Sequence, residues 1–209
     1  MGEAKVKRQK QAQQNEKHKH VDFGRVAGAV NRLCAAASNN YGADCVLQAW
    51  LAQSILKKLD VDSTIRAGFS AWRVGNGDGD VISHIPQDAK PVARATEAAY
   101  HAWLQVGSMI FDVTTKQLRA KASMIDYMDG GNTTVDWAPD FLLIDVSAVS
   151  SYHMVKMGGA GLVHYVAHPI VRENILRDFQ PDQADADMAW LLYSNPDAIV
   201  FGPQSATSD

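Results

Sequence analysis

The sequence predicts an α+β fold in which N-terminal helices pack on an antiparallel β-sheet. Two segments between residues 21 and 59 repeat apolar residues at steps of three and four, which is typical of helices that bury one side. After residue 60 the chain changes to short extended runs separated by glycine-rich turns, which is typical of antiparallel strands. With 209 residues, 46% of them hydrophobic, the chain is long enough for one sizeable core, so we expect a single domain over residues 21–209.

Residues 1–20 form a basic, polar N-terminal arm. Lys and Arg outnumber Glu there, and the segment has almost no apolar content, so burial cannot offset the entropy of ordering it. We expect a frayed helix or a disordered arm, with a basic contact for a partner as the alternative reading.

The overall composition argues against several classes of partner. A net charge of −3 gives no general attraction to nucleic acid or to an anionic membrane. No apolar run resembles a secretion signal or reaches the length of a bilayer span, so we expect a cytoplasmic protein with no membrane partner. The sequence leaves the oligomeric state open.

The two predicted N-terminal helices each contain one of the two cysteines. Residues 21–37 place Cys34 on the apolar stripe, where a small buried side chain is the favoured reading. After a break at residues 38–42, a second helix is expected over residues 45–59, with Cys45 at its start. Free amide groups and the helix dipole stabilise a thiolate at such a position. The two cysteines lack the paired spacing of a zinc site.

Residues 65–74 and 81–85 are expected to be strands joined by the turn at residues 75–80. The Gly, Asn and Asp residues of this turn resemble a calcium loop superficially. The turn lacks the glycine after the third acidic position and the glutamate at the twelfth, so a simple hairpin is favoured and no metal is expected.

A second hairpin is predicted over residues 99–106 and 109–113, with the turn at Gly107 and Ser108. If Val106 faces Met109, the register of an antiparallel pair places His101 and Asp112 on one face of the sheet as diagonal neighbours.

The remaining chain predicts fewer regular elements. A helix is expected at residues 116–124, irregular structure at 129–140, strands at 141–144 and 161–167, the latter ended by Pro169, and a helix at 182–193. His164 and His168 lie four apart on one predicted strand, as metal ligands could, but no third ligand is identifiable and a structural role is favoured.

The predicted elements place Cys45 at a helix start and His101 and Asp112 on two neighbouring strands. These positions suit the three roles of a thiol catalytic site. Thiol catalysis needs an ionised cysteine, an imidazole that takes and returns a proton, and a third group that orients the imidazole. The alternative is an ordinary buried His–Asp pair and a packed cysteine. The catalytic reading is favoured because the three residue types occur together in one order.

The sequences around these residues resemble the transglutaminase-like superfamily, whose order of Cys, His and Asp is shared by papain-like enzymes. Tyr-His-Ala-Trp-Leu-Gln-Val at residues 100–106 and Phe-Asp-Val-Thr at 111–114 are similar to its His-Ala-Trp and Asp-x-Thr strands. Arg-Ala-Gly-Phe at 66–69 is similar to the strand that follows the nucleophile helix. The match covers residues 40–115, and the rest looks most like an uncharacterised bacterial family with a papain-like fold.

The resemblance implies a papain-like or transglutaminase-like fold with Cys45 as nucleophile, His101 as general base and acid, and Asp112 as the orienting carboxylate. Papain-like enzymes also place a Gln six residues before the cysteine to stabilise the oxyanion; here that position is Asn39, with Asn40 an equal candidate. Asp44 departs from the expected pattern, because a carboxylate beside the thiol opposes thiolate formation unless it turns to solvent or caps the helix.

These residues predict a thiol-dependent hydrolase, a peptidase or amidase, that acts on a small-molecule or peptide amide or ester through an acyl-enzyme. One alternative is an acyltransferase of the transglutaminase or arylamine N-acetyltransferase type, in which an amine replaces water. Another is a catalytically inactive binding module of the same fold. No cofactor is implied, since a thiol enzyme supplies its own chemistry.

Overall fold

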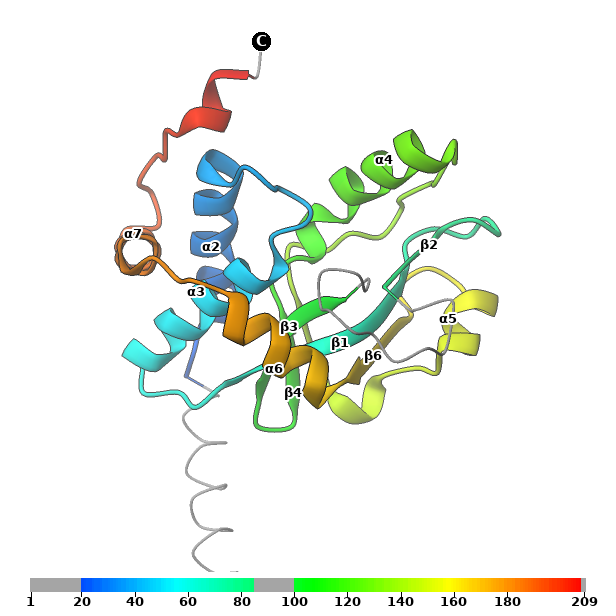
Figure 1. Cartoon of the computed structure of the whole chain (residues 1–209), viewed down its shortest axis with the longest axis horizontal. Helices are drawn as coiled ribbons and strands as arrows, with labels where there is room; N and C mark the ends of the chain where they lie inside the picture. The colour runs from blue at the N-terminus through cyan, green and yellow to red at the C-terminus, as the bar shows by residue number, and fades with distance from the viewer. Residues whose placement is uncertain (1–19, 85–99, 208–209) are drawn as a thin grey trace, which may run out of the picture.

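The computed structural model describes residues 20–84 and 100–207. Most of the predicted arm, residues 1–19, lies outside the described residues, as does Ile85 at the end of the second predicted strand. The described part has a curled antiparallel sheet with helices on both of its sides (Figure 1). The prediction of an α+β fold is therefore confirmed at the level of its architecture.

Along the described chain two helices come first, and strands and further helices follow them. The principal helices are α2 (Phe23–Ala37), α3 (Cys45–Lys58), α4 (Leu118–Asp129), α5 (Tyr152–Met157), α6 (Pro169–Asp178) and α7 (Gln183–Ser194). The strands are β1 (Thr64–Arg73), β2 (Val81–Ser83), β3 (His101–Val106), β4 (Met109–Asp112), β5 (Leu142–Asp145) and β6 (Val163–Ala167). Helices α2, α3, α6 and α7 lie on one side of the sheet, and α4 and α5 lie on the other (Figure 1).

The long strand β1 organises the sheet. It pairs with β3 through its first half, with β2 through its last residues, and with β6, all antiparallel. Gly68 lies opposite both His101 of β3 and Ala167 of β6, so these two strands occupy opposite edges of β1. A side chain at Gly68 would collide with the backbone carbonyl of Val166, which explains the glycine at this crossing.

The two faces of the sheet carry different cores, because successive side chains of a strand alternate in direction. One face packs Ile65, Leu104 and Phe111 against α2, α3 and α7. The other face carries Trp72 and Trp103, which pack with β6 and with the apolar side of α4. His101 and Asp112 belong to this second face, since they alternate with Ala102 and Phe111.

The predicted hairpin register is confirmed. Val106 lies opposite Met109 and Leu104 opposite Phe111. The hairpin between β1 and β2 is also confirmed, and the Asp80 carboxylate in its turn accepts hydrogen bonds from the Gly77 and Thr134 backbone N–H groups. This carboxylate is therefore used to hold the turn to the irregular segment that follows α4.

Two differences from the predicted elements have local causes. The helix expected at residues 116–124 begins with a 3-10 turn, η2 (Thr115–Gln117), and continues as α4 to Asp129, where Gly130 ends it with a φ of 73°. Helices α5 and α6 were not predicted. Pro169 ends the strand as expected but is also the first residue of α6, a position that proline favours because its missing N–H is not needed there.

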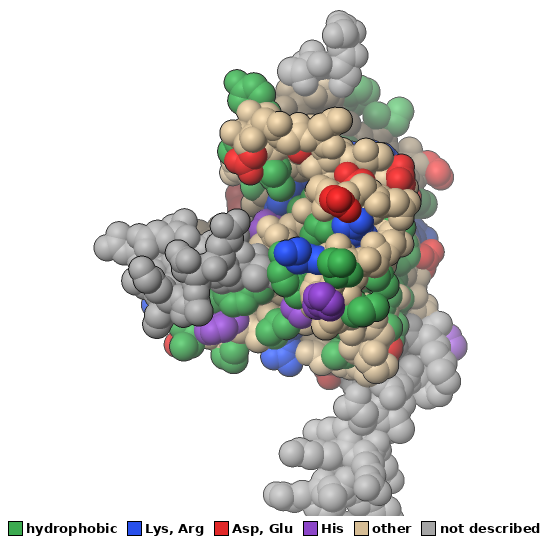
Figure 2. Space-filling view, turned by 90° about the vertical axis from the view of Figure 1, so that its right-hand side faces the viewer, with side chains coloured by type: hydrophobic (Ala, Val, Ile, Leu, Met, Phe, Trp, Pro, Cys, Tyr) green, Lys and Arg blue, Asp and Glu red, His purple; other side chains and the backbone are tan. Residues whose placement is uncertain are grey.

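The surface that carries α4, β2 and α5 has mixed charge. Figure 2 shows basic side chains and histidines among hydrophobic ones there, with acidic side chains toward the upper part of the view. Of the helices in the described part of the chain, none combines the length and apolar character that crossing a membrane requires.

Candidate active site

Cys45 is the first residue of α3 and is partly exposed. The turn that leads into it is held against η2, because the Gly42 backbone N–H donates a 2.9 Å hydrogen bond to Oε1 of Gln117. Gly42 adopts a φ of 95°, a conformation that favours glycine. The turn therefore fixes the start of α3 beside the end of the β3–β4 hairpin.

His101 and Asp112 form the contact that the hairpin register predicted. Nε2 of His101 lies 2.7 Å from Oδ2 of Asp112. His101 is 2% exposed and Asp112 is fully buried. The two residues are 11 positions apart in the chain, and the hairpin between them lets the imidazole and the carboxylate meet.

A network of donors fixes the Asp112 carboxylate. Oδ1 accepts hydrogen bonds from the backbone N–H and the hydroxyl of Thr114, at 2.9 and 2.7 Å. Oδ2 accepts a second bond from the Tyr165 hydroxyl at 2.7 Å, and that hydroxyl accepts one from Nε1 of Trp72. The carboxylate is satisfied on both oxygens, so it can orient the imidazole without moving.

The charges of the pair favour an imidazolium. Burial lowers the pKa of His101, but the nearby Asp112 and Cys45 side chains outweigh this and raise the pKa to about 9. Burial likewise opposes ionisation of Asp112, yet His101, Tyr165 and Thr114 hold its pKa below the usual value. Because Nε2 is bonded to Asp112, the ring nitrogen left for Cys45 is Nδ1.

A small pocket opens beside the thiol. The residues that line it come from α3 and its preceding turn, from β1 and β3, and from the start of α4: Gly42, Cys45, Trp72, His101, Thr114, Gln117, Leu118 and Lys121. The Gln117 side chain is buried, and its Nε2 has no hydrogen-bond partner among the described residues. An amide N–H without a partner in this pocket is available to an oxygen of a bound molecule.

The structure brings Cys45, His101 and Asp112 together but leaves Asn39 outside. Asn39 and Asn40 are both exposed in the turn before α3, and neither lines the pocket. Gln117 occupies the place in the pocket that was expected of them. Sequence reasoning missed it because it follows β4, far from the cysteine in the chain, and only folding brings the two together.

Asp44 neither caps the helix nor faces solvent. Its side chain makes no capping hydrogen bond to α3 and is 8% exposed. Oδ1 instead accepts a 2.6 Å hydrogen bond from Nε2 of Gln48, one turn further along the helix. The carboxylate is thereby turned along α3 and held by a buried amide.

His84 is a second histidine at the site. It follows β2, and its ring stacks on the His101 ring with centroids 5.9 Å apart. Burial, Lys121 and His101 lower its pKa to about 2, against the opposing effect of Asp112. It is therefore a neutral ring at neutral pH, and its Nε2 is buried without a partner among the described residues.

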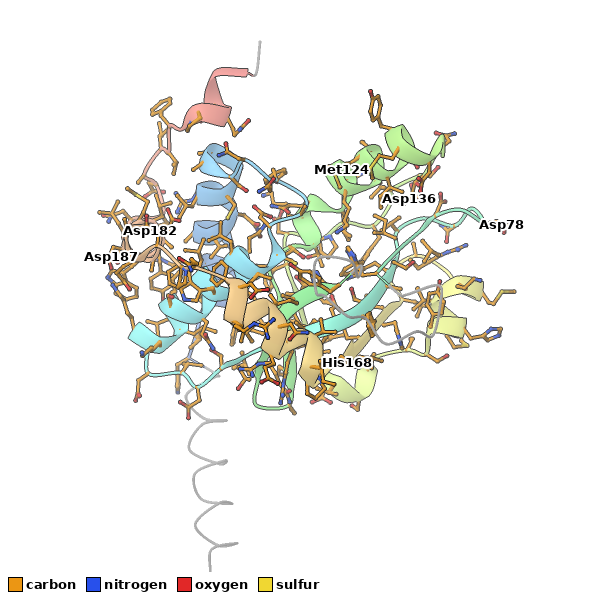
Figure 3. The ribbon with its side chains drawn as sticks, viewed as in Figure 1. Asp78, Met124, Asp136, His168, Asp182 and Asp187 are labelled. Carbon is orange, nitrogen blue, oxygen red and sulfur yellow. The ribbon has the colours of Figure 1, made fainter. Side chains whose placement is uncertain are left out.

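The histidines considered as metal ligands have structural partners. Nδ1 of His164 lies 2.8 Å from the carbonyl oxygen of Ser150. His168 stands at the start of α6 (Figure 3), where Nδ1 accepts a hydrogen bond from the Val171 N–H. Over residues 20–84 and 100–207, no group of three His, Cys, Asp or Glu side chains is arranged to hold a metal ion.

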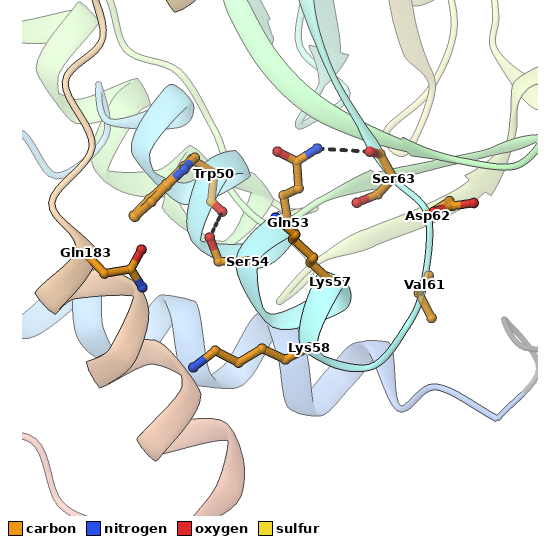
Figure 4. Close-up of a pocket in the computed structure, with 9 residues that line it drawn as sticks. All are labelled: Trp50, Gln53, Ser54, Lys57, Lys58, Val61, Asp62, Ser63 and Gln183. Carbon is orange, nitrogen blue, oxygen red and sulfur yellow. Dashed lines mark hydrogen bonds between the residues drawn. The ribbon is translucent and has the colours of Figure 1, made fainter.

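A second, larger pocket lies between the C-terminal half of α3 and the start of α7 (Figure 4). Several of its polar groups are engaged in structural contacts: Gln53 donates to the Ser63 carbonyl and Ser54 to the Trp50 carbonyl. Lys58 pairs with Asp187 at 3.3 Å. No cysteine or histidine is among the described residues that line this pocket, so the pocket beside Cys45 is the candidate site.

Comparison with known proteins gives a fold and no function. No protein-family model matches the chain, and no curated protein matches it. The chain is similar to a crystal structure known as genomics APC5867, with a TM-score of 0.60 and 14% identity over 86% of this chain and 82% of that one. At this identity the likeness concerns the fold alone, and the description of that protein names no activity.

Proposed function

We propose that this protein is a thiol-dependent hydrolase of amides or esters, with a papain-like or transglutaminase-like arrangement of its catalytic groups. The observation that carries the proposal is the position of the His101 ring, which is hydrogen-bonded to Asp112 and lines the same small pocket as Cys45. A helix that presents its first residue to a sheet bearing the His–Asp pair also supports the resemblance seen in the sequence.

The reaction follows from the charges of the three groups. The Cys45 thiolate attacks the carbonyl carbon, and the His101 imidazolium gives its proton to the leaving amine or alcohol as the bond to the carbonyl breaks. The product of this step is a thioester between the acyl group and Cys45. Neutral His101 then takes a proton from water, the hydroxide attacks the thioester, and the acid leaves as the thiol is restored.

Gln117 supplies the oxyanion donor in this scheme. Its Nε2 is buried, lacks a partner among the described residues and lines the pocket that holds Cys45. The backbone amides of the first turn of α3, which have no intrahelical acceptors, add further donors at the same place. We therefore assign to Gln117 the role that the sequence suggested for Asn39.

The test of this proposal is the pH dependence of Cys45 alkylation by iodoacetamide, with Cys34→Ser as the background. An imidazolium partner should keep Cys45 reactive at pH 6–7, below the range of a free thiol with a pKa of about 8.5. His101→Ala should remove this reactivity and leave an ordinary thiol curve.

An ordinary thiol curve in both proteins would contradict the proposal and favour a binding module of the same fold. Hydrolysis and acyl transfer share the thioester, so the acceptor is determined separately. Product analysis with and without an added primary amine should give free acid under the proposal, whereas the amide adduct would identify an acyltransferase.

A further inference from the structure

Lys121 is a cation in the catalytic pocket that the proposed reaction does not use. It lies on α4 four residues after Gln117, and both side chains line the pocket with Cys45. Four residues correspond to about one helical turn, so the two side chains point to the same side of the segment. Lys121 and the proposed oxyanion donor therefore contribute to the wall of the same pocket.

Within residues 20–84 and 100–207, Lys121 has no carboxylate at ion-pair distance. The lysine of the same segment that points outward, Lys116, does have one, at 3.1 Å from Asp140. A lysine that points into a pocket without such a partner is available to an anion that enters.

The surroundings of Lys121 strengthen its attraction for an anion. Burial is the largest effect on its pKa and lowers it, while Cys45, Asp112 and Asp44 raise it. Asp112 is held by His101 and Tyr165, and Oδ1 of Asp44 accepts a bond from Gln48, while Oδ2 of Asp44 is buried without a partner among the described residues. His84 nearby is neutral. A cation removed from bulk water attracts an anion more strongly than one at the surface.

We propose that Lys121 recognises a carboxylate of the substrate, so that the protein acts on amides or esters whose carboxylate lies within a few bonds of the scissile carbonyl. This inference rests on the proposed function, because it assigns the substrate class of the same site. The pocket is small and Gln117 and Lys121 both line it, so the oxyanion and the carboxylate would be held together.

The test compares two alkylating reagents that differ in charge. Iodoacetate carries a carboxylate and iodoacetamide is its neutral analogue, so the ratio of their rates at Cys45 measures attraction for an anion. In the Cys34→Ser background, Lys121→Met should reduce this ratio by about 3–10-fold, and Lys121→Glu should reduce it further. Lys116→Met, which removes the outward-pointing lysine, should leave the ratio unchanged.

A ratio that Lys121→Met leaves unchanged would overturn the inference. Equal slowing of both reagents would also overturn it, because Lys121 would then only stabilise the thiolate. The ratio does not depend on how reactive Cys45 is, so the carboxylate site is tested even if the iodoacetamide profile contradicts the proposed hydrolase. Far-ultraviolet circular dichroism of each variant checks that the fold is retained.

Discussion

The two cysteines of this chain differ in environment more than in sequence position. Cys34 lies in the last turn of α2, is 2% exposed and belongs to the apolar core between the helices and the sheet. Burial, with Asp44 and Asp185, raises its pKa far above that of a free thiol. Cys45 begins α3, is partly exposed and faces the imidazole of His101.

Under the proposed function, this difference separates a thiol that only packs from a thiol that reacts. The helix interior offers Cys34 no polar group to balance a negative charge, so the neutral thiol packs as a small apolar side chain. The helix start, the imidazolium and the pocket give Cys45 donors and access together. Cys34 therefore contributes to the packing of the core, whereas Cys45 lines the candidate site.

The largest expected effect separates the two thiols directly. Iodoacetamide at pH 7 should label the native protein once, at Cys45, and label both cysteines after unfolding in urea, as counted by intact mass. Cys45→Ala should abolish labelling of the native protein and hydrolysis of any amide or ester that it turns over, whereas Cys34→Ala should retain both. Labelling of native Cys34 at a comparable rate would contradict the contrast.

The next effect concerns the oxyanion donor. Gln117→Ala should lower turnover by about 10²–10³-fold, because a donor that acts on the developing negative charge is removed. Its effect on the iodoacetamide rate should be smaller, since alkylation forms no oxyanion and the variant then loses only the Gly42 hydrogen bond to Oε1 that holds the turn before Cys45. Asn39→Ala is the matched control and should change neither rate. A larger loss in Asn39→Ala than in Gln117→Ala would restore the assignment made from the sequence.

The same contrast shows which parts of the site the sequence could predict. The hairpin register depends on a two-residue turn and strict alternation, and it correctly placed His101 beside Asp112. The helix start at Cys45 was equally local. These features come from chain neighbours, whose geometry is limited by hydrogen bonding and sterics.

The sequence did not predict three residues of the site, for one common reason: Gln117, Lys121 and Tyr165. Each reaches the site from an element that packs there only in the folded protein, and none belongs to a local motif. Asn39 was chosen from its spacing to the cysteine, but the turn directs it to solvent. The unpredicted helix α6 had a usable signal, because a proline that ends a strand can also be the first residue of a helix.

The smallest expected effect is the contribution of Cys34 to stability and its dependence on pH. Cys34→Ala should cost about 1 kcal/mol of unfolding free energy at pH 7, since it removes a packed sulfur from the core. The raised pKa in the folded protein means that this thiol ionises first in the unfolded chain. The stability that it contributes is therefore complete below about pH 8.5 and falls by about 1.4 kcal/mol per pH unit above it.

Urea unfolding of the wild type and of Cys34→Ala at pH 7, 8.5 and 10 measures this difference. The advantage of the wild type should shrink and then reverse as the pH rises, because alanine has no proton to lose. Cys45→Ala, made at the partly exposed helix start, should not cause the same reversal. If the wild-type advantage were constant up to pH 10, Cys34 would have to ionise in the folded core, and the contrast between the two thiols would be one of position alone.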